Sequence, residues 1–198
     1  MRPKNLTLEK EILDATLKLL ETKEPVEIGM RDVAKMCNVS ATSIYHYFKD
    51  KNELFKKISI TCLAGLRDRM EADVSKTDDC KEKVRFALES FRDWCFENPT
   101  VAVAVLSKFS ENIGDTELPA FYVCNKFGLE LFEECVRKKI AVSKNPKLDT
   151  EIMIAGLWGC IQISLSKRND PEFWNRGKDF TDCFIEKMMN VFFQNVER

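Results

Sequence analysis

Small polar side chains, aromatic hydroxyl groups, the only histidine of the chain and a lysine gather within residues 41–51. Thr42 and His46 carry groups that can hydrogen-bond base edges in a DNA major groove, and the Ala41 methyl can contact a thymine methyl. Small residues at the start of a helix also let its backbone approach the groove closely. The stretch therefore has the chemistry of a DNA-reading helix.

Residues 33–54 contain the elements that would position these groups. An apolar stripe begins the stretch, and Asn38 follows it as one of the few non-glycine residues that tolerate a left-handed backbone at a corner. Ser40 can cap the next helix. In that helix Ile44 and Phe48 lie four apart and would point into a core. The pattern predicts a helix-turn-helix with its polar side outward.

A further helix is expected from Asp50, with Glu53 three residues later in a variant of the capping box. Lys51 then lies at a helix N-terminus, where unpaired N–H groups favour a phosphate. A structural alternative exists, because any small helical corner needs a cap and a core. The order and spacing of the features together favour DNA binding.

Residues 8 to 55 resemble the N-terminal domain of TetR-family transcription regulators. The matching elements are Ile12-x-x-Ala15, Asp32-Val33-Ala34, the corner Asn38-Val39-Ser40 and the run from Ile44 to Leu54. The resemblance implies that Tyr45, Tyr47 and Lys51 grip phosphates. It also implies that Ala41, Thr42 and His46 face bases. The predicted DNA-binding residues are Ala41, Thr42, Ser43, Tyr45, His46, Tyr47 and Lys51.

Three positions depart from the family pattern. Glu24-Pro25 stands where a glycine ends the first helix, so that turn must close differently. Gly29 stands where a Thr or Ser caps the second helix and touches a phosphate, so the hydroxyl for that contact is missing. Asn38 replaces the corner glycine and is conformationally acceptable.

Helical periodicity dominates the 198 residues, of which 44% are hydrophobic, and this predicts an all-α fold. We expect a helix-turn-helix domain over residues 1–50 and a helical regulatory and dimerisation domain over residues 51–198. A long helix from Asp50 to about Lys76 would link them without a flexible linker. Further helices are expected at about 79–97, 100–112, 119–141, 149–166 and 170–195.

Charge is nearly balanced along the chain, whose formal net charge is −1. Residues 1–57 hold 11 Lys and Arg against 9 Asp and Glu. Binding to DNA would therefore rest on a few placed contacts and on dimerisation rather than on a strongly basic field.

The last two expected helices are apolar on more than one face. Their apolar residues are Ile152, Ile154, Ala155, Leu157, Trp158, Ile161, Ile163, Leu165, Phe180, Cys183, Phe184, Ile185, Met188, Met189, Val191, Phe192 and Phe193. Such helices need two partners, their own core and another surface. A deeply buried core pair would give the same pattern. We favour a homodimer through a four-helix bundle, as the resemblance implies, which would read a palindromic operator.

Aromatic residues are frequent between the long helix and the last two helices. In TetR-like proteins this region encloses a pocket for a small inducer. The predicted ligand-binding residues are Trp94, Phe109, Phe121, Tyr122, Trp158 and Gln162. Aromatic residues at helical spacing also serve as ordinary core. The sparse charge of the apolar segments suggests an apolar or neutral ligand.

Other protein classes lack support in the sequence. His46 is the only histidine, and there is no G-x-S-x-G, P-loop, dinucleotide turn or spaced metal-ligand cluster. We therefore expect no catalytic residues, no metal and no cofactor. The eight cysteines form no C-x-x-C pair and no leader precedes them, so we expect reduced thiols in a cytoplasmic protein. The longest apolar run, Ile152 to Ile161, is half of the ~20 residues that span a membrane.

These observations predict a ligand-responsive transcriptional regulator, a repressor that an inducer releases from its operator. A DNA-binding nucleoid-associated or protein-controlled regulator without a small-molecule inducer is the alternative, and the sequence separates the two poorly.

Overall fold

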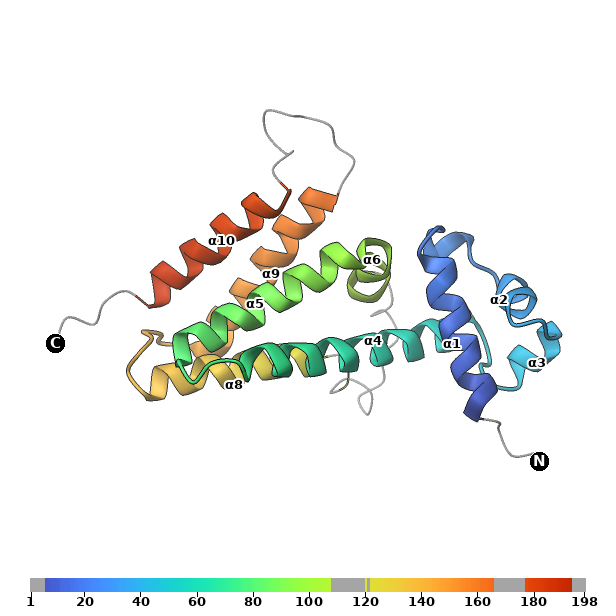
Figure 1. The fold of residues 1–198 in the computed structure, drawn as a ribbon, viewed down its shortest axis with the longest axis horizontal. Coiled ribbons are helices and arrows are strands. Elements are labelled where there is room, and N and C mark those ends of the chain that lie inside the picture. Colours follow the sequence, from blue (N-terminus) through green and yellow to red (C-terminus); the bar gives the residue numbers. More distant parts are fainter. Residues whose placement is uncertain (1–5, 108–119, 121, 166–176, 194–198) are drawn as a thin grey trace. The chain divides into compact units, whose positions relative to one another are not determined.

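The computed structural model describes residues 6–107, 120, 122–165 and 177–193 (Figure 1). Over these ranges the chain forms helices and turns without a β-strand, which confirms the all-α prediction. The N-terminal elements are α1 (Leu6–Leu20), the 3₁₀ turn η1 (Pro25–Glu27), α2 (Met30–Met36), α3 (Ala41–Tyr45) and α4 (Lys51–Val74). They are followed by α5 (Cys80–Glu97), α6 (Pro99–Ser107), α8 (Val123–Arg137), α9 (Pro146–Leu165) and α10 (Gly177–Phe192).

The helices form two compact units. Unit 1 consists of Met1–Leu63 and Asn98–Leu118, and unit 2 consists of Ala64–Glu97 and Pro119–Arg198. Helix α4 is continuous and contributes its first half to unit 1 and its second half to unit 2. The domain boundary expected at residue 50 was drawn between functions, whereas these two units are defined by packing. That functional boundary therefore remains a prediction.

Unit 1 is built on the apolar side of α1, which packs against α2. Ile12, Leu20 and Ile44 have no exposed surface. Burying one such side chain contributes about 1.5–3 kcal/mol. The first turn closes without a glycine, as the sequence requires. There Pro25 is buried in η1, and the N–H of Glu24 donates to Glu27 Oε2 at 2.9 Å.

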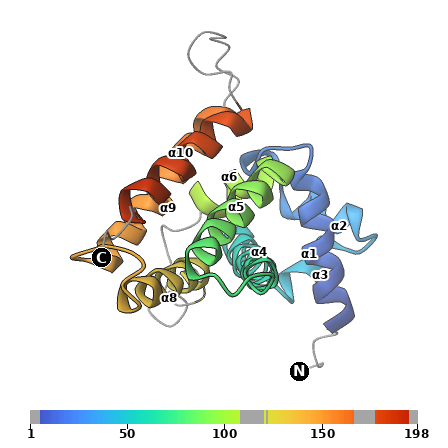
Figure 2. The same cartoon turned by 60° about the vertical axis from the view of Figure 1, so that its left-hand side comes forward.

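Unit 2 contains α5, α8, α9, α10 and the second half of α4. Helix α8 packs against α5 and α9, and α10 packs against α9 and α5. Figure 2 shows α9 and α10 running side by side. The Phe184 ring occupies the place that a side chain at residue 156 would take, so Gly156 permits this close approach.

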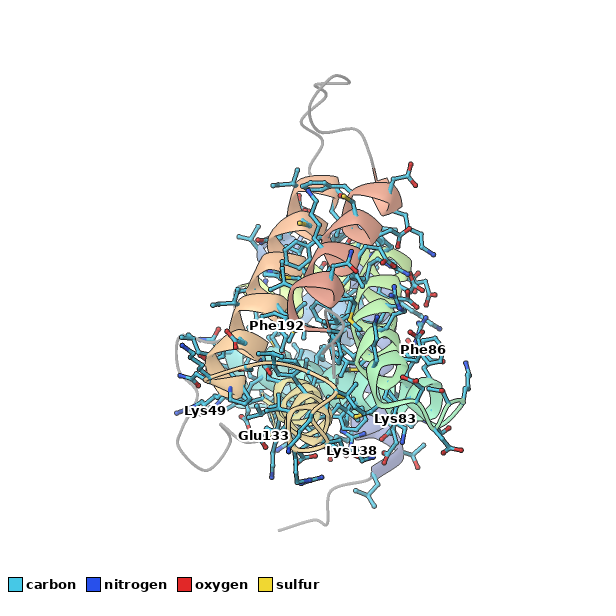
Figure 3. All side chains as sticks on the ribbon, turned by 90° about the vertical axis from the view of Figure 1, so that its left-hand side faces the viewer. Lys49, Lys83, Phe86, Glu133, Lys138 and Phe192 are labelled. Atoms are coloured by element: carbon cyan, nitrogen blue, oxygen red, sulfur yellow. The ribbon has the colours of Figure 1, made fainter. Side chains whose placement is uncertain are left out.

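Helix α8 separates charged from apolar residues. Glu133 and Lys138 are exposed and point outward (Figure 3). Phe132 is fully buried and meets Phe192 of α10 edge-to-face, with ring centroids 5.2 Å apart. This contact joins α8 to the C-terminal end of α10.

Charged pairs hold α5 to α10. Arg92 is only 3% exposed, and its Nε donates to Asp93 Oδ1 at 2.8 Å. Its Nη1 also donates to Asp182 of α10. A second arginine of α5, Arg85, pairs with Glu186 of α10. A buried guanidinium needs such partners, because an unpaired buried charge is strongly destabilising.

Helix α9 differs from the sequence-based expectation. By length and composition it is apolar enough to cross a membrane, although no transmembrane segment was expected. In unit 2 it packs along α5, α8 and α10, so part of its apolar surface serves the helix bundle. Another part stays open: Ile152 is half exposed, and a Cβ at Gly159 would meet no atom within 4 Å.

None of the eight cysteines, all of which lie in the described ranges, forms a disulfide. Burial raises the pKa of the Cys62 thiol to about 11 and that of Cys124 to about 12. Burial also raises the pKa of Cys95 and Cys135. Cys183 is exposed on α10. Most of these thiols are therefore protonated and behave as small apolar side chains.

Candidate nucleic-acid interface and ligand cavity

The corner between α2 and α3 has the predicted geometry. Asn38 adopts a left-handed backbone with φ 52°, and the next residue, Val39, donates its N–H to Ala34 O at 3.0 Å. Ser40 Oγ then accepts the N–H of Ser43 at 3.1 Å, which confirms it as the cap of α3. The corner fixes the direction in which α3 leaves α2.

Helix α3 separates its buried and exposed residues as the sequence indicates. Within α3 Ile44 is buried, and Thr42 and Tyr45 are exposed. The helix is shorter than expected, because it ends at Tyr45, and the exposed His46 and the buried Phe48 follow it. The remaining predicted contact residues of this stretch, Ala41, Ser43 and Tyr47, are half-buried. Polar groups therefore lie on the solvent-exposed side of α3, and the buried Ile44 on the other side anchors the helix in the core of unit 1.

Ser43 has a role that the sequence did not reveal. Its hydroxyl lies 2.8 Å from Ser40 Oγ, and its N–H donates to the same oxygen. Because Ser43 is part of the cap, its hydroxyl is less available to a base than the hydroxyl of Thr42. The exposed side of α3 is therefore formed mainly by Thr42, Tyr45 and His46.

The start of α4 carries the expected capping carboxylates. Asp50 Oδ1 accepts the N–H of Glu53 at 2.9 Å. Glu53 Oε2 accepts the N–H of Lys49 at 2.6 Å, one residue before the position that a standard capping box uses. Both carboxylates are engaged with the backbone of their own chain.

Lys51 is tied to the turn at η1. Its Nζ donates to Val26 O at 3.3 Å and lies 5.5 Å from the centre of the Phe55 ring. Partial burial lowers the pKa of Lys51, and the nearby Asp32 opposes this shift. An ammonium has three N–H donors, so the bond to Val26 leaves two for a phosphate.

Gly29 caps α2 without a side chain. Its N–H donates to Asp32 Oδ2 at 2.8 Å, so Asp32 satisfies the first turn of the helix. The Thr or Ser hydroxyl expected at the N-cap of α2 is therefore absent, and the Asp32 carboxylate takes over its capping role. A phosphate at the start of α2 would meet backbone and the neighbouring Asp32 instead.

Unit 2 encloses a cavity of about 40 Å³ between α4, α5, α8 and α9. It is lined by Met70, Val84, Ala87, Leu88, Phe91, Cys124, Asn125, Gly128, Thr150, Met153 and Ile154. No member of the lining is charged. Met70 is the only one from α4. The Thr150 hydroxyl donates to Pro146 O at 2.8 Å within its own helix.

The residues predicted for a ligand pocket lie elsewhere. Trp94 and Trp158 are half-buried, Tyr122 and Gln162 are exposed, and none of these four lines the cavity. Phe109 and Phe121 lie outside the described residues. Met70, Asn125 and Gly128 were missed because aliphatic and small residues in a helix resemble ordinary core. One sequence signal could have indicated the cavity: Asn125 lies three residues before Gly128, so a polar and a small residue share a helix side that is otherwise apolar.

A charged groove lies between α5 and α10. It is lined by Glu89, Arg92, Asp93, Lys178, Asp182, Ile185 and Glu186. Burial raises the pKa of Glu89, and its arginine neighbours partly offset this shift. The described residues include no group of three or more side chains able to hold a metal ion.

Comparison with known proteins gives one family and one close relative in sequence. Residues 12–58 match the family described as "Bacterial regulatory proteins, tetR family". An "Uncharacterized HTH-type transcriptional regulator" of Haemophilus influenzae is 30% identical over 101 residues, which are 51% of this chain and 54% of that protein. The chain thus spans about half the length of the curated relative that it matches.

Solved structures share the fold over nearly the whole chain. FadR of Bacillus subtilis, in complex with stearoyl-CoA, has a TM-score of 0.69 and 17% identity, covering 92% of this chain and 98% of that one. RolR in complex with resorcinol has a TM-score of 0.69 and 14% identity, covering 93% of this chain and 86% of that one. At these identities the similarity establishes the architecture.

Proposed function

We propose that this chain is a TetR-type transcription regulator, because residues 12–58 match the model of that family, and that it acts as a ligand-responsive repressor. In this proposal a homodimer binds a palindromic operator and a small-molecule inducer releases it. The observation that carries the proposal is the exposed side of α3, with Thr42, Tyr45 and His46 above a buried Ile44. The family is one of regulators rather than enzymes.

Each DNA contact is assigned a role. Thr42 and His46 read base edges, and Ala41 contacts a thymine methyl. Tyr45, Tyr47 and Lys51 bind phosphates and set the register of α3 in the groove. Ser43 supports the cap of α3, and its hydroxyl contributes to DNA binding only secondarily.

The proposed dimer forms through α9 and α10. Ile152 of α9 and Val191 of α10 are each at least 50% exposed, and Gly159 leaves open space beside α9. A second copy of the chain would cover this apolar surface in a four-helix bundle. Two recognition helices would then read two half-sites of a palindrome.

The proposed inducer binds in the cavity of unit 2. Two proteins of the same fold hold small molecules, stearoyl-CoA in FadR and resorcinol in RolR. In this chain α4 contributes Met70 to the cavity and Lys51 to the DNA-binding set, so one helix links the two sites. We place the regulator in the cytoplasm, and on the nucleoid when it is bound to DNA.

Selection of duplexes from a random DNA pool by the purified protein, at fixed near-physiological salt, tests the proposal. We expect a two-fold symmetric sequence. The double variant Thr42→Ala/His46→Ala should lose this preference, and Glu133→Ala, which changes an exposed residue of α8, should keep it. Retention that depends on salt but not on sequence would instead favour a nucleoid-associated protein.

A further inference from the structure

Among the described residues, the lining of the cavity in unit 2 includes no charged side chain that could pair with an ionised ligand. Burial raises the pKa of the Cys124 thiol to about 12, so this side chain is uncharged at neutral pH. The Thr150 hydroxyl proton is already donated to Pro146 O. The Asn125 side chain makes no hydrogen bond within the described part of the chain, so its amide is available to a ligand. A buried charge without a partner is strongly disfavoured, whereas one hydroxyl or carbonyl could pair with Asn125.

The size of the cavity limits the ligand further. A volume of about 40 Å³ is well below the roughly 300–1,000 Å³ of ordinary ligand pockets. Two flexible side chains belong to the lining, Met70 from α4 and Met153 from α9. Methionine changes rotamer readily, so the cavity can enlarge by moving these two side chains. This enlargement suits a single ring but not a long acyl chain.

We propose that the cavity takes a compact, uncharged molecule of about one ring, bearing one group for Asn125, and that Met70 senses its arrival. This inference rests on the proposed function, because it identifies the inducer class and the sensing residue of that same site. Met70 is 5% exposed and is the single point at which α4 enters the lining. A ligand that displaces Met153 alone moves only α9, whereas a ligand that displaces Met70 acts on the helix that carries Lys51.

A ligand that moves Met70 must also disturb the contacts that α4 makes next to the cavity. One turn before Met70, the Arg67 guanidinium stacks on the Phe127 ring of α8 at 3.5 Å and also pairs with Glu71. The contact with Phe127 holds α4 against α8, whereas the pair with Glu71 lies within α4 and fixes the position of the Arg67 side chain. The ligand shifts DNA binding only to the extent that it prefers the conformation in which α4 has moved.

The ligand class is tested with matched probes on the full-length protein. Benzyl alcohol and benzoate share a ring and differ in charge, and stearoyl-CoA is long and charged. We expect benzyl alcohol to raise Tm saturably, and benzoate and stearoyl-CoA to leave it unchanged at equal concentration. Gly128→Leu should fill the cavity and abolish the shift. Gly65→Leu is the control, because Gly65 lies on α4 with no atom within 4 Å of its Cβ position.

Sensing is tested by comparing Met70→Ala with Met153→Ala, which enlarge the cavity by shortening lining side chains of two different helices, α4 and α9. Both should bind benzyl alcohol at least as tightly as the wild type. At saturation the probe should weaken operator binding about tenfold in the wild type and in Met153→Ala, and less than twofold in Met70→Ala. Equal release by both variants would overturn the assignment of Met70.

A methyl NMR spectrum of the wild-type protein with labelled methionine gives a readout that needs no destabilised variant. The Met70 resonance, assigned with Met70→Leu, should shift on addition of benzyl alcohol, and that of the buried Met30 in α2 should not. A shift confined to Met153 would refute sensing by Met70. Failure of all probes to bind would overturn the ligand class while leaving the DNA selection result intact. Absence of operator binding would instead refute the proposed function, and the thermal and NMR results would still test the ligand class.

Discussion

Arg92 provides a quantitative test of what holds α10 in place. We consider Arg92→Met, which keeps most of the apolar stem and removes the guanidinium. Leaving a fully buried charge without its partner costs about 3–5 kcal/mol. Here the remaining carboxylates of Asp93 and Asp182 have side chains that are 34% and 45% exposed, so water can solvate them in part. The cost should therefore fall to about 2–3 kcal/mol, close to the value for hydrogen bonds to charged groups.

The assay is urea unfolding at fixed protein concentration, followed by circular dichroism. At about 2–4 °C per kcal/mol for a chain of this length, Tm should also fall by about 4–12 °C. Arg69→Met is the matched control, because Arg69 also pairs with a carboxylate, Glu97, but its side chain is 33% exposed. An exposed pair contributes at most about 1 kcal/mol. If the two variants lost the same free energy of unfolding, the burial of Arg92 would not have the importance that we assign to it.

Four further predictions address the DNA-binding module, the charged groove and the thiols. Lys51→Ala should weaken binding to all sequences and reduce the salt slope by about 1, and an unchanged slope in a titration at several salt concentrations would exclude a phosphate contact. Asn38→Ala should lower the free energy of unfolding by about 1 kcal/mol and Asn38→Gly should not, because φ is positive there; equal urea midpoints for the two variants would contradict this. Glu89 has a raised pKa in the folded protein, so its protonated form stabilises the fold below the unfolded pKa, and this contribution is lost as pH rises through the folded value. Glu89→Gln should therefore increase stability at pH 7 relative to the wild type and change it little at pH 4, and a pH series of urea midpoints measures the difference. With a thiol reagent at pH 8, the half-buried Cys37 of unit 1 should react in the native protein and Cys95 only after unfolding, and rapid native labelling of Cys95 in peptide maps would show that the core opens readily.

The helix-turn-helix was predictable because its signals are local. Asn38 determines the corner and Ser40 the cap of α3 within three residues of sequence. Helical spacing pointed to Ile44 and Phe48 as a buried pair, and both are buried, although Phe48 lies just beyond the end of α3. The exposure of Thr42 and His46 then follows from the same periodicity.

Helix ends were predicted less accurately where the chain gives no clear stop. The helix expected at 119–141 ends at Arg137, and Lys139 follows it with φ 59°, a left-handed conformation that sequence reading assigns to glycine. The helix expected from residue 149 begins at Pro146, where Asn145 Oδ1 accepts the N–H of Leu148 at 3.2 Å. Asn-Pro there caps a helix rather than marking a loop.

The cavity could not be predicted, because its lining comes from four helices. Which side chains of α4, α5, α8 and α9 meet depends on the rotation of each helix about its axis, and apolar periodicity leaves that rotation loosely defined. The sequence-based prediction of the ligand pocket favoured aromatic residues because large side chains commonly line such pockets. The residues that leave space are small or flexible, such as Gly128 and Met70.

The continuity of α4 has a mechanical consequence. From Met70 back to Lys51 the helix rises about 29 Å, at about 1.5 Å per residue. If Met70 is displaced sideways and the helix tilts by about 5°, the far end moves by about 2.5 Å over that length. Functional contacts must be held to within about 0.5 Å of their working geometry. In the proposed regulator, a tilt of this size at Met70 would therefore be enough to take Lys51 out of the geometry that a phosphate contact requires.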